Sequence, residues 1–218
     1  MIGALGDIHG DFDSVRRIVQ RHPDVRAWLC VGDLPGEDGV YEPVDVPIFF
    51  IKGNNENFDV LASGALPANL HYVPNAVAIR VGDLSVAGLG GTFAPTWYET
   101  APENLPHPRK GTARATELAD KRRHFVRAEV TACREMREVD IFLSHEAPRP
   151  YRVGRMDAGK TAINEVLAGL QPRLHLFGHH HRFSEQRVQR VCSVGLDLVS
   201  RSYLLIDAKT LTYQQLQS

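Results

Sequence analysis

Five short polar blocks in this chain each directly follow an apolar run that is typical of a strand. They are Gly6-Asp7-Ile8-His9-Gly10, Gly32-Asp33-Leu34, Gly53-Asn54-Asn55-Glu56, Ser144-His145 and Gly178-His179-His180-His181. Loops at strand ends are where proteins of mixed helix and strand place binding chemistry. The carboxylate, carboxamide and imidazole groups that recur in the blocks suit hard to borderline divalent cations. We therefore expect the five blocks to form one two-metal site.

The spacing within the blocks fits this chemistry. Asp7 and His9 are two residues apart, so with local bending both side chains can approach one ion. Asp33 arrives from a neighbouring strand, and one carboxylate can bridge two metals. In such sites about 3.5 to 4 Å separates the ions, and a bound water becomes a nucleophile near neutral pH. The competing interpretation is a set of helix caps and turn residues, but the order and strand context of all five blocks argue against it.

Length and composition predict one soluble domain over residues 1–218, since 43% hydrophobic and 23% charged residues are ordinary for a globular protein. The first apolar stretch meets Asp7 at once, and no apolar run is long enough to span a bilayer. We therefore expect no signal peptide, no membrane segment and a cytoplasmic protein. Cys30, Cys133 and Cys192 lack metal-type spacing and are expected to be buried thiols.

The net charge of -1 hides an uneven distribution. Residues 107–127 contain seven Lys or Arg against two Asp or Glu. Such a segment could attract a phosphate-bearing ligand. A charge run is more often a solvated helix face, which is the interpretation we favour.

The hydrophobic pattern indicates a β-α-β opening followed by antiparallel pairing. Gly82-Asp83 suits a tight hairpin turn, so a second sheet is expected to begin there. Residues 91–111 are expected to form a long loop before a long helix, giving a loop-helix insertion near 92–138. Strands are predicted at 1–5, 27–32, 46–51, 76–81, 84–89, 139–143, 173–177, 188–194, 203–206 and 211–216, and helices at 11–20, 113–138 and 157–170.

The order Asp-x-His-Gly, Gly-Asp, Gly-Asn-x-Glu, His and Gly-His-x-His resembles that of the calcineurin-like metallophosphoesterase superfamily over nearly the whole chain. The resemblance implies an α/β fold, a four-layer α/β/β/α sandwich of two mixed sheets. It also implies hydrolysis of a phosphoester by a hydroxide that bridges two metal ions. The implied ligands are Asp7, His9, Asp33 and His181 for one ion, and Asp33, Asn54, His145 and His179 for the other, with Asp33 bridging and His180 at a variable position.

Within the superfamily, residues 46–56 and 139–148 are most similar to the catalytic core of RNA lariat debranching enzymes. Those enzymes carry an additional C-terminal region that is absent from these 218 residues. The resemblance therefore implies phosphodiester chemistry in general, with a nucleotide or nucleic acid as a possible substrate. It does not extend to cleavage of a 2′,5′-linked branch.

One position departs from the common pattern. A histidine usually follows the metal-binding asparagine, where it contacts the phosphate and assists the leaving group, whereas this chain has Asn55. Asparagine donates hydrogen bonds but cannot act as a general acid near neutral pH. We predict catalytic roles for Asn55 and Asp33, and a preference for phosphodiesters with good leaving groups. Phosphomonoesters are the alternative substrate class.

Other phosphate contacts are less strongly indicated. The Asp-Arg-Gly extension of Ser/Thr protein phosphatases is replaced here by Leu34-Pro35-Gly36, which makes a phosphoprotein substrate less expected. Asn55 is the preferred substrate contact and His180 is a further one. Lys52 and the basic segment are also candidates, although each could be ordinary surface polarity.

The ligand set does not identify the ions. Manganese is the first choice, and iron, zinc or nickel are possible. A non-catalytic scaffold of the same fold is the rival class, which the Asn55 substitution suggests, but the complete ligand set argues against it. The oligomeric state is not determined by the sequence.

Residues 154–161 match the P-loop pattern by letter, ending in Gly159-Lys160-Thr161. A P-loop needs a strand immediately before its first glycine, whereas residues 146–153 intervene with two prolines. Too few residues then follow to build a nucleotide-binding fold. The pattern therefore predicts no P-loop.

Overall fold

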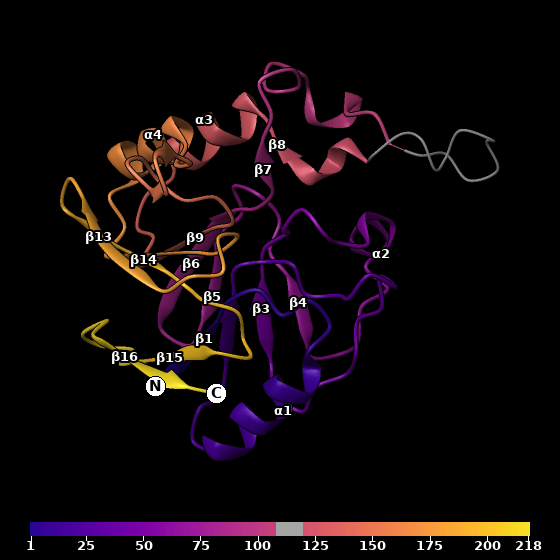
Figure 1. The fold of residues 1–218 in the computed structure, drawn as a ribbon, viewed down its shortest axis with the longest axis vertical. Coiled ribbons are helices and arrows are strands. Elements are labelled where there is room, and N and C mark those ends of the chain that lie inside the picture. The colour runs from indigo at the N-terminus through magenta and orange to yellow at the C-terminus, as the bar shows by residue number, and fades with distance from the viewer. Residues whose placement is uncertain (108–119) are drawn as a thin grey trace.

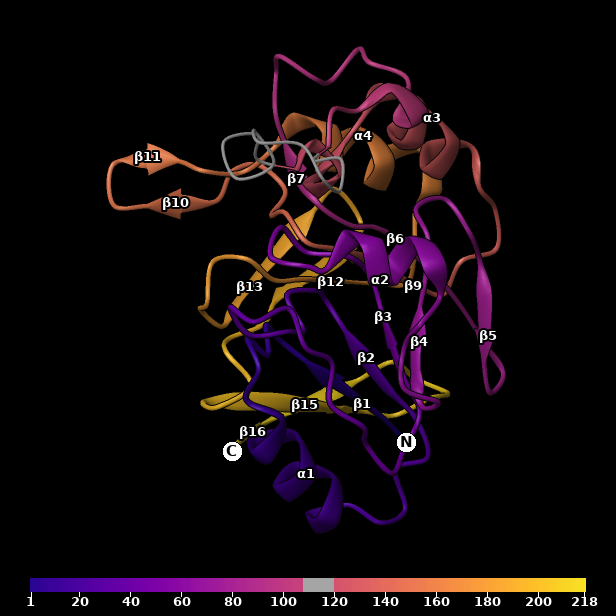
Figure 2. The same ribbon diagram turned by 90° about the vertical axis from the view of Figure 1, so that its right-hand side faces the viewer.

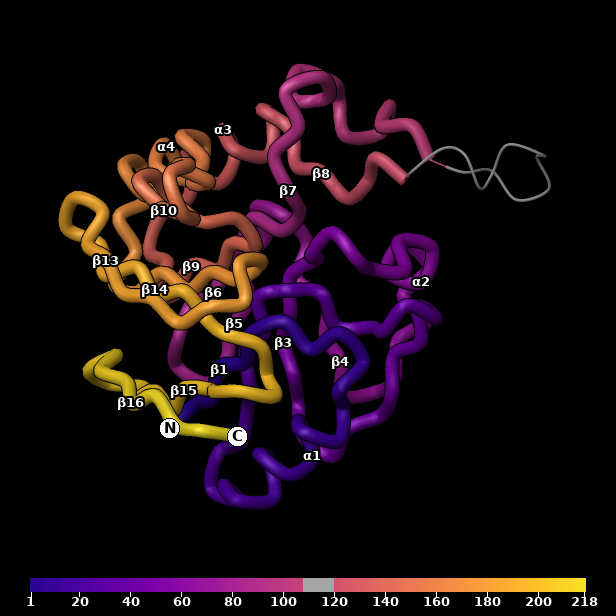
Figure 3. The backbone as a smooth tube through the Cα atoms, in the orientation of Figure 1, coloured from indigo at the N-terminus to yellow at the C-terminus, as the bar shows by residue number. Residues whose placement is uncertain are grey.

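The computed structural model describes residues 1–107 and 120–218, which form two six-stranded mixed sheets that face each other (Figure 1). The first sheet pairs β1, β2, β3 and β4 in parallel and β1, β15 and β16 antiparallel. Its order is β16 (Tyr213–Gln217), β15 (Ser202–Ile206), β1 (Ile2–Leu5), β2 (Trp28–Cys30), β3 (Ile48–Phe50) and β4 (Leu70–Tyr72). Strands β1 and β16, at the two ends of the chain, both belong to this sheet (Figure 3).

The second sheet has the same number of strands and a parallel centre. Strands β6, β9, β12 and β14 run parallel, while β5 and β13 pair antiparallel at the two edges. Its order is β13 (Ser184–Val188), β14 (Val191–Gly195), β12 (Leu174–Phe177), β9 (Ile141–Ser144), β6 (Leu84–Leu89) and β5 (Ile79–Val81). The predicted hairpin around Gly82 is the turn between β5 and β6.

Helices cover the outer faces of the sheets. Helices α1 (Phe12–Arg21) and α2 (Phe58–Ser63) pack on the first sheet, and α3 (Arg127–Glu135) and α4 (Thr161–Leu170) pack on the second (Figure 2). A separate apolar cluster fills the space between the sheets, with Leu29 and Leu143 from opposite sheets among its members. The predicted four-layer α/β/β/α sandwich is confirmed.

Local chemistry explains where α1 begins and how it packs. Asp11 precedes the helix, and its side chain accepts a hydrogen bond from the Ser14 N–H at 3.1 Å, as an N-cap should. Phe12, Val15 and Ile18 then lie on one buried face against the first sheet. The helix therefore holds the loop that carries the first polar block.

The predicted long helix over 113–138 is too long: among the described residues only Arg127–Glu135 forms an α-helix there, and 113–119 lie outside them. A 3₁₀ turn (Lys121–Arg123) leads into β8 (His124–Phe125), which pairs with β7 (Thr92–Phe93). A further 3₁₀ turn spans Pro102–Asn104. Helix α3 begins only at Arg127, where the Glu129 carboxylate accepts the N–H of Val126 at 2.9 Å. Pairing with β7 prevents Phe125 from continuing the helical pattern.

The helix predicted over 157–170 begins at Thr161, four residues later than expected. Residues 152–157 instead form a projecting hairpin of β10 (Arg152–Val153) and β11 (Met156–Asp157) (Figure 2). The Asp157 carboxylate accepts the N–H groups of Tyr151 (2.8 Å) and Gly159 (3.1 Å), which stabilises this turn in place of a helix start.

No described helix is long and apolar enough to cross a membrane.

Candidate active site

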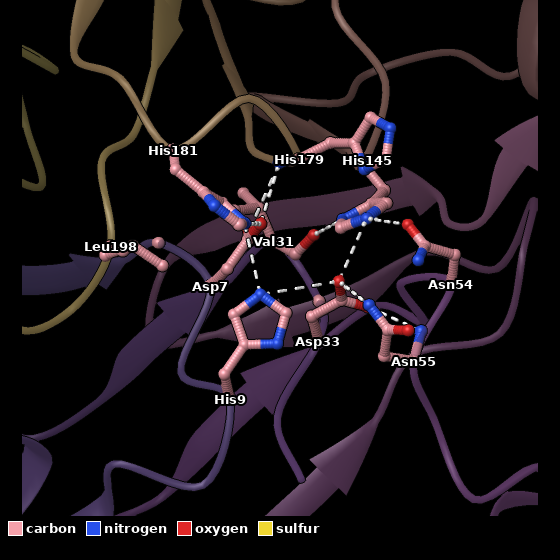
Figure 4. A network of polar contacts seen from close by, with 12 residues as sticks. Asp7, His9, Val31, Asp33, Asn54, Asn55, His145, His179, His181 and Leu198 are labelled. Atoms are coloured by element: carbon pink, nitrogen blue, oxygen red, sulfur yellow. Dashed lines mark hydrogen bonds and ion pairs between the residues drawn. The ribbon is translucent and has the colours of Figure 1, made fainter. Parts of the chain in front are cut away.

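The five polar blocks come together where strands of both sheets end (Figure 4). Asp7 follows β1, Asp33 follows β2 and Asn54 follows β3, so parallel pairing brings the first three blocks to one edge. His145 follows β9 and His179 follows β12, which are also parallel neighbours. Contacts between the histidines and the carboxylates then join the two sheets across this edge.

One group of predicted metal ligands consists of Asp7, His9 and His181. The His181 Nε2 atom lies 3.0 Å from Asp7 Oδ2 and 3.1 Å from His9 Nε2. One ligand atom from each residue lies within 4.8 Å of the others, as a shared cation requires. The hydrogen bond to Asp7 and the charge of that carboxylate raise the pKa of His181, which shows that this position favours positive charge.

The second group contains Asp7, Asp33 and His145, beside Asn54. His145 is fully buried, and its Nδ1 lies 2.8 Å from the carbonyl oxygen of Val31, which can only accept. The neutral imidazole therefore carries its lone pair on Nε2, as a metal ligand should. That Nε2 faces Asn54 Oδ1 at 3.1 Å and Asp33 Oδ2 at 3.6 Å, both of which are also acceptor atoms.

Asp33 belongs to the second group and also faces a histidine of the first, whereas Asp7 belongs to both groups. Its Oδ2 atom is 3.8 Å from His9 Nε2 and 3.6 Å from His145 Nε2, so one oxygen faces an imidazole from each group. Burial alone would raise the pKa of this carboxyl, but nearby His145 and the hydrogen bonds from Asn55 lower it. Asp33 is therefore held in its charged form.

The atoms that converge at the site are of the kinds that bind divalent cations. The site gathers carboxylate oxygens, a carboxamide oxygen and imidazole nitrogens. Burying these acceptor atoms together without a positive charge to offset them would cost free energy. Burial opposes protonation of His145, yet the charges of Asp33 and Asp7 raise its pKa. The cluster thus attracts positive charge, and its donor set fits divalent cations.

His179 lies at the site in a different way from the other predicted ligands. Its backbone N–H donates to Asp7 Oδ2 at 3.0 Å, and its ring centroid is 4.9 Å from that of His145. Its imidazole belongs to neither group of clustered ligand atoms among the described residues. Burial lowers its pKa to about 3, so the ring is neutral and able to act as a ligand.

Four of the predicted ligands have a left-handed backbone conformation. His9, Asp33, His179 and His181 are four of the nine described non-glycine residues with positive φ, and their values lie between 48° and 70°, a strained region that Asn, Asp and His enter more often than other L-residues. Such strain costs on the order of 1–3 kcal/mol per residue and persists at functional sites where the surrounding structure enforces it. Gly53 makes part of this possible, because a Cβ there would clash with the Asp33 carboxylate.

Asn55 contacts Asp33 through two groups. Its backbone N–H donates to Asp33 Oδ1 at 2.7 Å and its side-chain amide donates to Asp33 Oδ2 at 2.8 Å. Asn55 therefore orients this carboxylate and lies at the exposed mouth of the site. His180 stacks on Tyr151 with 4.5 Å between ring centroids, and its buried Nε2 has no hydrogen-bond partner among the described residues.

The basic segment reaches the site through one residue that the sequence did not single out. Arg123 Nη2 donates to the backbone carbonyl of Asn54 at 2.7 Å. Arg122 pairs with Asp120 at 2.6 Å, and both side chains are largely shielded from solvent, so this stretch is not the solvated helix face that was expected. Lys52, a candidate phosphate contact, instead donates to the carbonyls of Arg122 and His124 at 2.9 and 3.2 Å. Lys52 and Arg123 thus connect the insertion to the Asn54 loop.

Glu56 also connects loops of the site. It belongs to the third polar block, but the sequence did not indicate a role for it. Its Oε1 accepts the N–H groups of Gly53 (3.1 Å) and Leu34 (3.4 Å), and its Oε2 accepts the Tyr41 hydroxyl at 2.6 Å. It therefore connects the Asp33 loop to the Asn54 loop. Burial raises the pKa of Glu56 to about 7 despite these hydrogen bonds.

We expect the metal-free wild type to lose stability as the pH rises from 4.5 to about 7, and the Glu56→Gln variant to lose less over the same range. The folded protein binds this proton more tightly than the unfolded chain, so its free energy of unfolding falls as pH rises across the window, by about 3 kcal/mol at most. Chemical denaturation in EDTA at pH 5 and pH 8, comparing both proteins, measures this. An unchanged difference between the two pH values in Glu56→Gln would contradict it.

The fold and the site together define a class: a metallophosphoesterase, with carboxylates and imidazoles gathered at the edge of two facing mixed sheets. A family model for calcineurin-like phosphoesterases matches residues 1–183, and the chain belongs to this family. Members hydrolyse phosphoesters with divalent metal ions. This confirms the resemblance read from the five blocks.

The sequence identity between this chain and individual relatives is low. The chain is 26% identical to the lariat debranching enzyme of Schizosaccharomyces pombe over 200 residues, covering 80% of this chain and 42% of that protein. It is 26% identical to an uncharacterized protein of Haemophilus influenzae, covering 89% and 91% of the two chains. The chain spans less than half the length of the debranching enzymes of S. pombe and Arabidopsis thaliana. Among solved structures, TT1561 of Thermus thermophilus has the same fold, with a TM-score of 0.69, 17% identity and coverage of 99% and 97%.

Proposed function

We propose that residues 1–218 form one domain that hydrolyses phosphodiesters of nucleotide or nucleic-acid type with two divalent ions. Asp7, His9, Asp33 and His181 would hold one ion, and Asp33, Asn54, His145 and His179 the other. The observation that carries the proposal is Asp33 Oδ2, which faces an imidazole nitrogen from each group at 3.8 and 3.6 Å. When bound, the ions would activate a water and neutralise charge on the phosphoryl oxygens.

The protein's own groups prepare the site for this reaction. Asn55 fixes both oxygens of Asp33, and the Val31 carbonyl fixes the tautomer of His145. Such supporting contacts typically affect metal affinity or activity by roughly 10–100-fold. Arg123 holds the Asn54 loop from the other side. These contacts would position the proposed ligands before substrate binds.

A diester is favoured over a monoester because of Asn55. It stands where a histidine would assist the leaving group, and its amide is engaged with Asp33. Diesters with acidic leaving groups need less protonation as the bond breaks. Similarity to lariat debranching enzymes supports a nucleotide or nucleic-acid substrate. The unpaired Cys30, Cys133 and Cys192 agree with a reducing compartment such as the cytoplasm.

The test is hydrolysis after metal removal and replacement. We expect the EDTA-treated protein to be inactive and manganese to restore activity best, with iron, zinc and nickel as the other candidates. Bis-nitrophenyl phosphate should be hydrolysed with a higher kcat/KM than mono-nitrophenyl phosphate. The reverse ranking would favour a phosphatase. A protein with no turnover under any of these metals would favour the non-catalytic scaffold.

A further inference from the structure

Three buried polar side chains form a hydrogen-bonded network across the centre of the second sheet. Ser144 on β9, His175 on β12 and Ser193 on β14 lie on three neighbouring strands, and each is 0% exposed. The His175 Nε2 atom lies 2.8 Å from Ser144 Oγ, and its Nδ1 atom lies 2.6 Å from Ser193 Oγ. None of the three is a ligand or a substrate contact in the proposed function.

The protons of this polar network can point in one direction only. Ser144 Oγ also lies 2.6 Å from the backbone carbonyl oxygen of Glu146, which can only accept, so the single hydroxyl proton of Ser144 is donated there. Ser144 Oγ then accepts from the Nε2–H of His175. The other nitrogen of a neutral imidazole carries a lone pair, so His175 Nδ1 accepts from the Ser193 hydroxyl.

Burial keeps the His175 ring neutral, as this direction requires. Desolvation lowers the pKa of His175 to about 3. The ring packs beside Phe142 and Phe177, with 5.9 and 5.7 Å between centroids. The neutral Nε2–H tautomer is therefore expected throughout the neutral pH range.

The far end of the network restrains the turn that carries His145. Ser144 and Glu146 flank His145, so the hydrogen bond between them closes the backbone around it. The backbone hydrogen bonds of His145 itself are long, since its N–H lies 3.4 Å from the Leu89 carbonyl oxygen and its carbonyl accepts from the Gly178 N–H at 3.3 Å. Typical N–H···O distances are about 2.7 to 3.2 Å, so the short contact from Ser144 is the stronger restraint on this turn.

The position of this turn decides where the His145 imidazole lies. The ring reaches the first sheet, where its Nδ1 donates to the Val31 carbonyl at 2.8 Å. Its Nε2 faces Asn54 Oδ1 at 3.1 Å and Asp33 Oδ2 at 3.6 Å. A shift of the turn would weaken the bond to Val31 and move Nε2 away from the other proposed ligands.

We propose that His175 is a positioning residue for the candidate metal site, acting through Ser144 and the Glu146 carbonyl to hold His145 in place. His175 touches neither the ions nor the substrate. It fixes the direction of the Ser144 hydroxyl, and this hydroxyl fixes the turn. The inference rests on the proposed function, in which His145 is a ligand of the second ion. A network that only satisfied buried polar groups would stabilise the fold without affecting His145.

The first experiment is heteronuclear NMR of the imidazole nitrogens in the EDTA-treated full chain. We expect wild-type His175 to be the Nε2–H tautomer and the His145 Nδ1–H proton to exchange slowly with water. His175→Leu and the smaller change Ser144→Ala should speed this exchange at least about tenfold, as loss of one buried hydrogen bond typically does. His175→Gln, whose amide can donate from near the position of Nε2, should keep the exchange slow.

Val166→Ala is the control that separates positioning from a general loss of stability. Val166 is a fully buried residue of α4 in the same apolar cluster as Phe142, and it lies outside the polar network. This variant should lower Tm, as His175→Leu does, but leave exchange of the His145 proton slow. Slow exchange in both His175→Leu and Ser144→Ala would overturn the proposal, and so would equally fast exchange in Val166→Ala.

The second experiment measures manganese binding by electron paramagnetic resonance. We expect wild type to bind two ions and His175→Leu to weaken one of the two sites by roughly tenfold, as loss of a contact that orients a metal-binding histidine does. His175→Gln and Val166→Ala should keep both affinities. Equal affinities in wild type and His175→Leu would overturn the proposal.

The two experiments distinguish failure of this inference from failure of the proposed function. A wild type that binds two ions and hydrolyses diesters, but whose His175 is the Nδ1–H tautomer, would refute the network and leave the function standing. A wild type that binds no manganese would refute the proposed function, and the NMR result would still show that the network holds His145.

Discussion

Asp33→Asn is expected to lower kcat/KM for bis-nitrophenyl phosphate by at least about 10³-fold, which corresponds to several kcal/mol of transition-state stabilisation. The Asp33 oxygens face His9 and His145 and accept two hydrogen bonds from Asn55. An asparagine removes the charge and replaces one acceptor oxygen with a donor. Neither ion would then share this side chain.

The measurement pairs kinetics with metal content by mass spectrometry. We expect Asp33→Asn to hold fewer than two ions per chain under conditions that load the wild type. Asp83→Asn, in the exposed β5–β6 turn, is the matched control and should behave as wild type. A variant that keeps kcat/KM within tenfold and binds two ions would show that Asp33 does not bridge the site.

Asn55→His is expected to raise turnover of alkyl diesters by about 10²-fold, the lower end of what a positioned general acid contributes. The side chain lies next to Asp33, where Asn55 Nδ2 donates at 2.8 Å. A histidine could make this contact with one ring nitrogen and present the other to the leaving group. Nitrophenyl esters, whose leaving groups need little protonation, should gain much less.

Wild type provides the reference for this prediction. Its rates should depend steeply on the leaving group, with nitrophenyl esters far ahead of alkyl esters. Asn55→Gln keeps the amide without adding an acid and should show no gain with alkyl esters. Comparable turnover of alkyl and nitrophenyl esters by wild type would mean that another group supplies the proton.

Short-range patterns predicted much of the fold. The strands after which the polar blocks lie, the β5–β6 hairpin and helix α1 could be read from alternation, a Gly-Asp turn and an Asp cap. His175 forms hydrogen bonds with Ser144 and Ser193 in the buried centre of the second sheet. Most of these features depend on neighbouring residues, which the sequence contains directly.

The incorrect predictions concern contacts between distant segments. The apolar spacing of 113–138 favoured one helix, but Phe125 pairs with β7 and packs near Phe93. Asp157 was taken into a helix, but it closes the turn before Gly159. Arg123 received no role because its acceptor, the Asn54 carbonyl, is 69 residues away. Local periodicity cannot indicate such partners.

The order of the motifs in the sequence indicated the family and the residue types available for metal binding, and the four-layer fold was what that resemblance implied. The tertiary structure alone decided which atoms converge. It brings Asp33 Oδ2 between two imidazoles and engages Asn55 with Asp33. Distances of a few ångströms between side chains from different strands arise from sheet pairing and core packing, which no single stretch of sequence specifies.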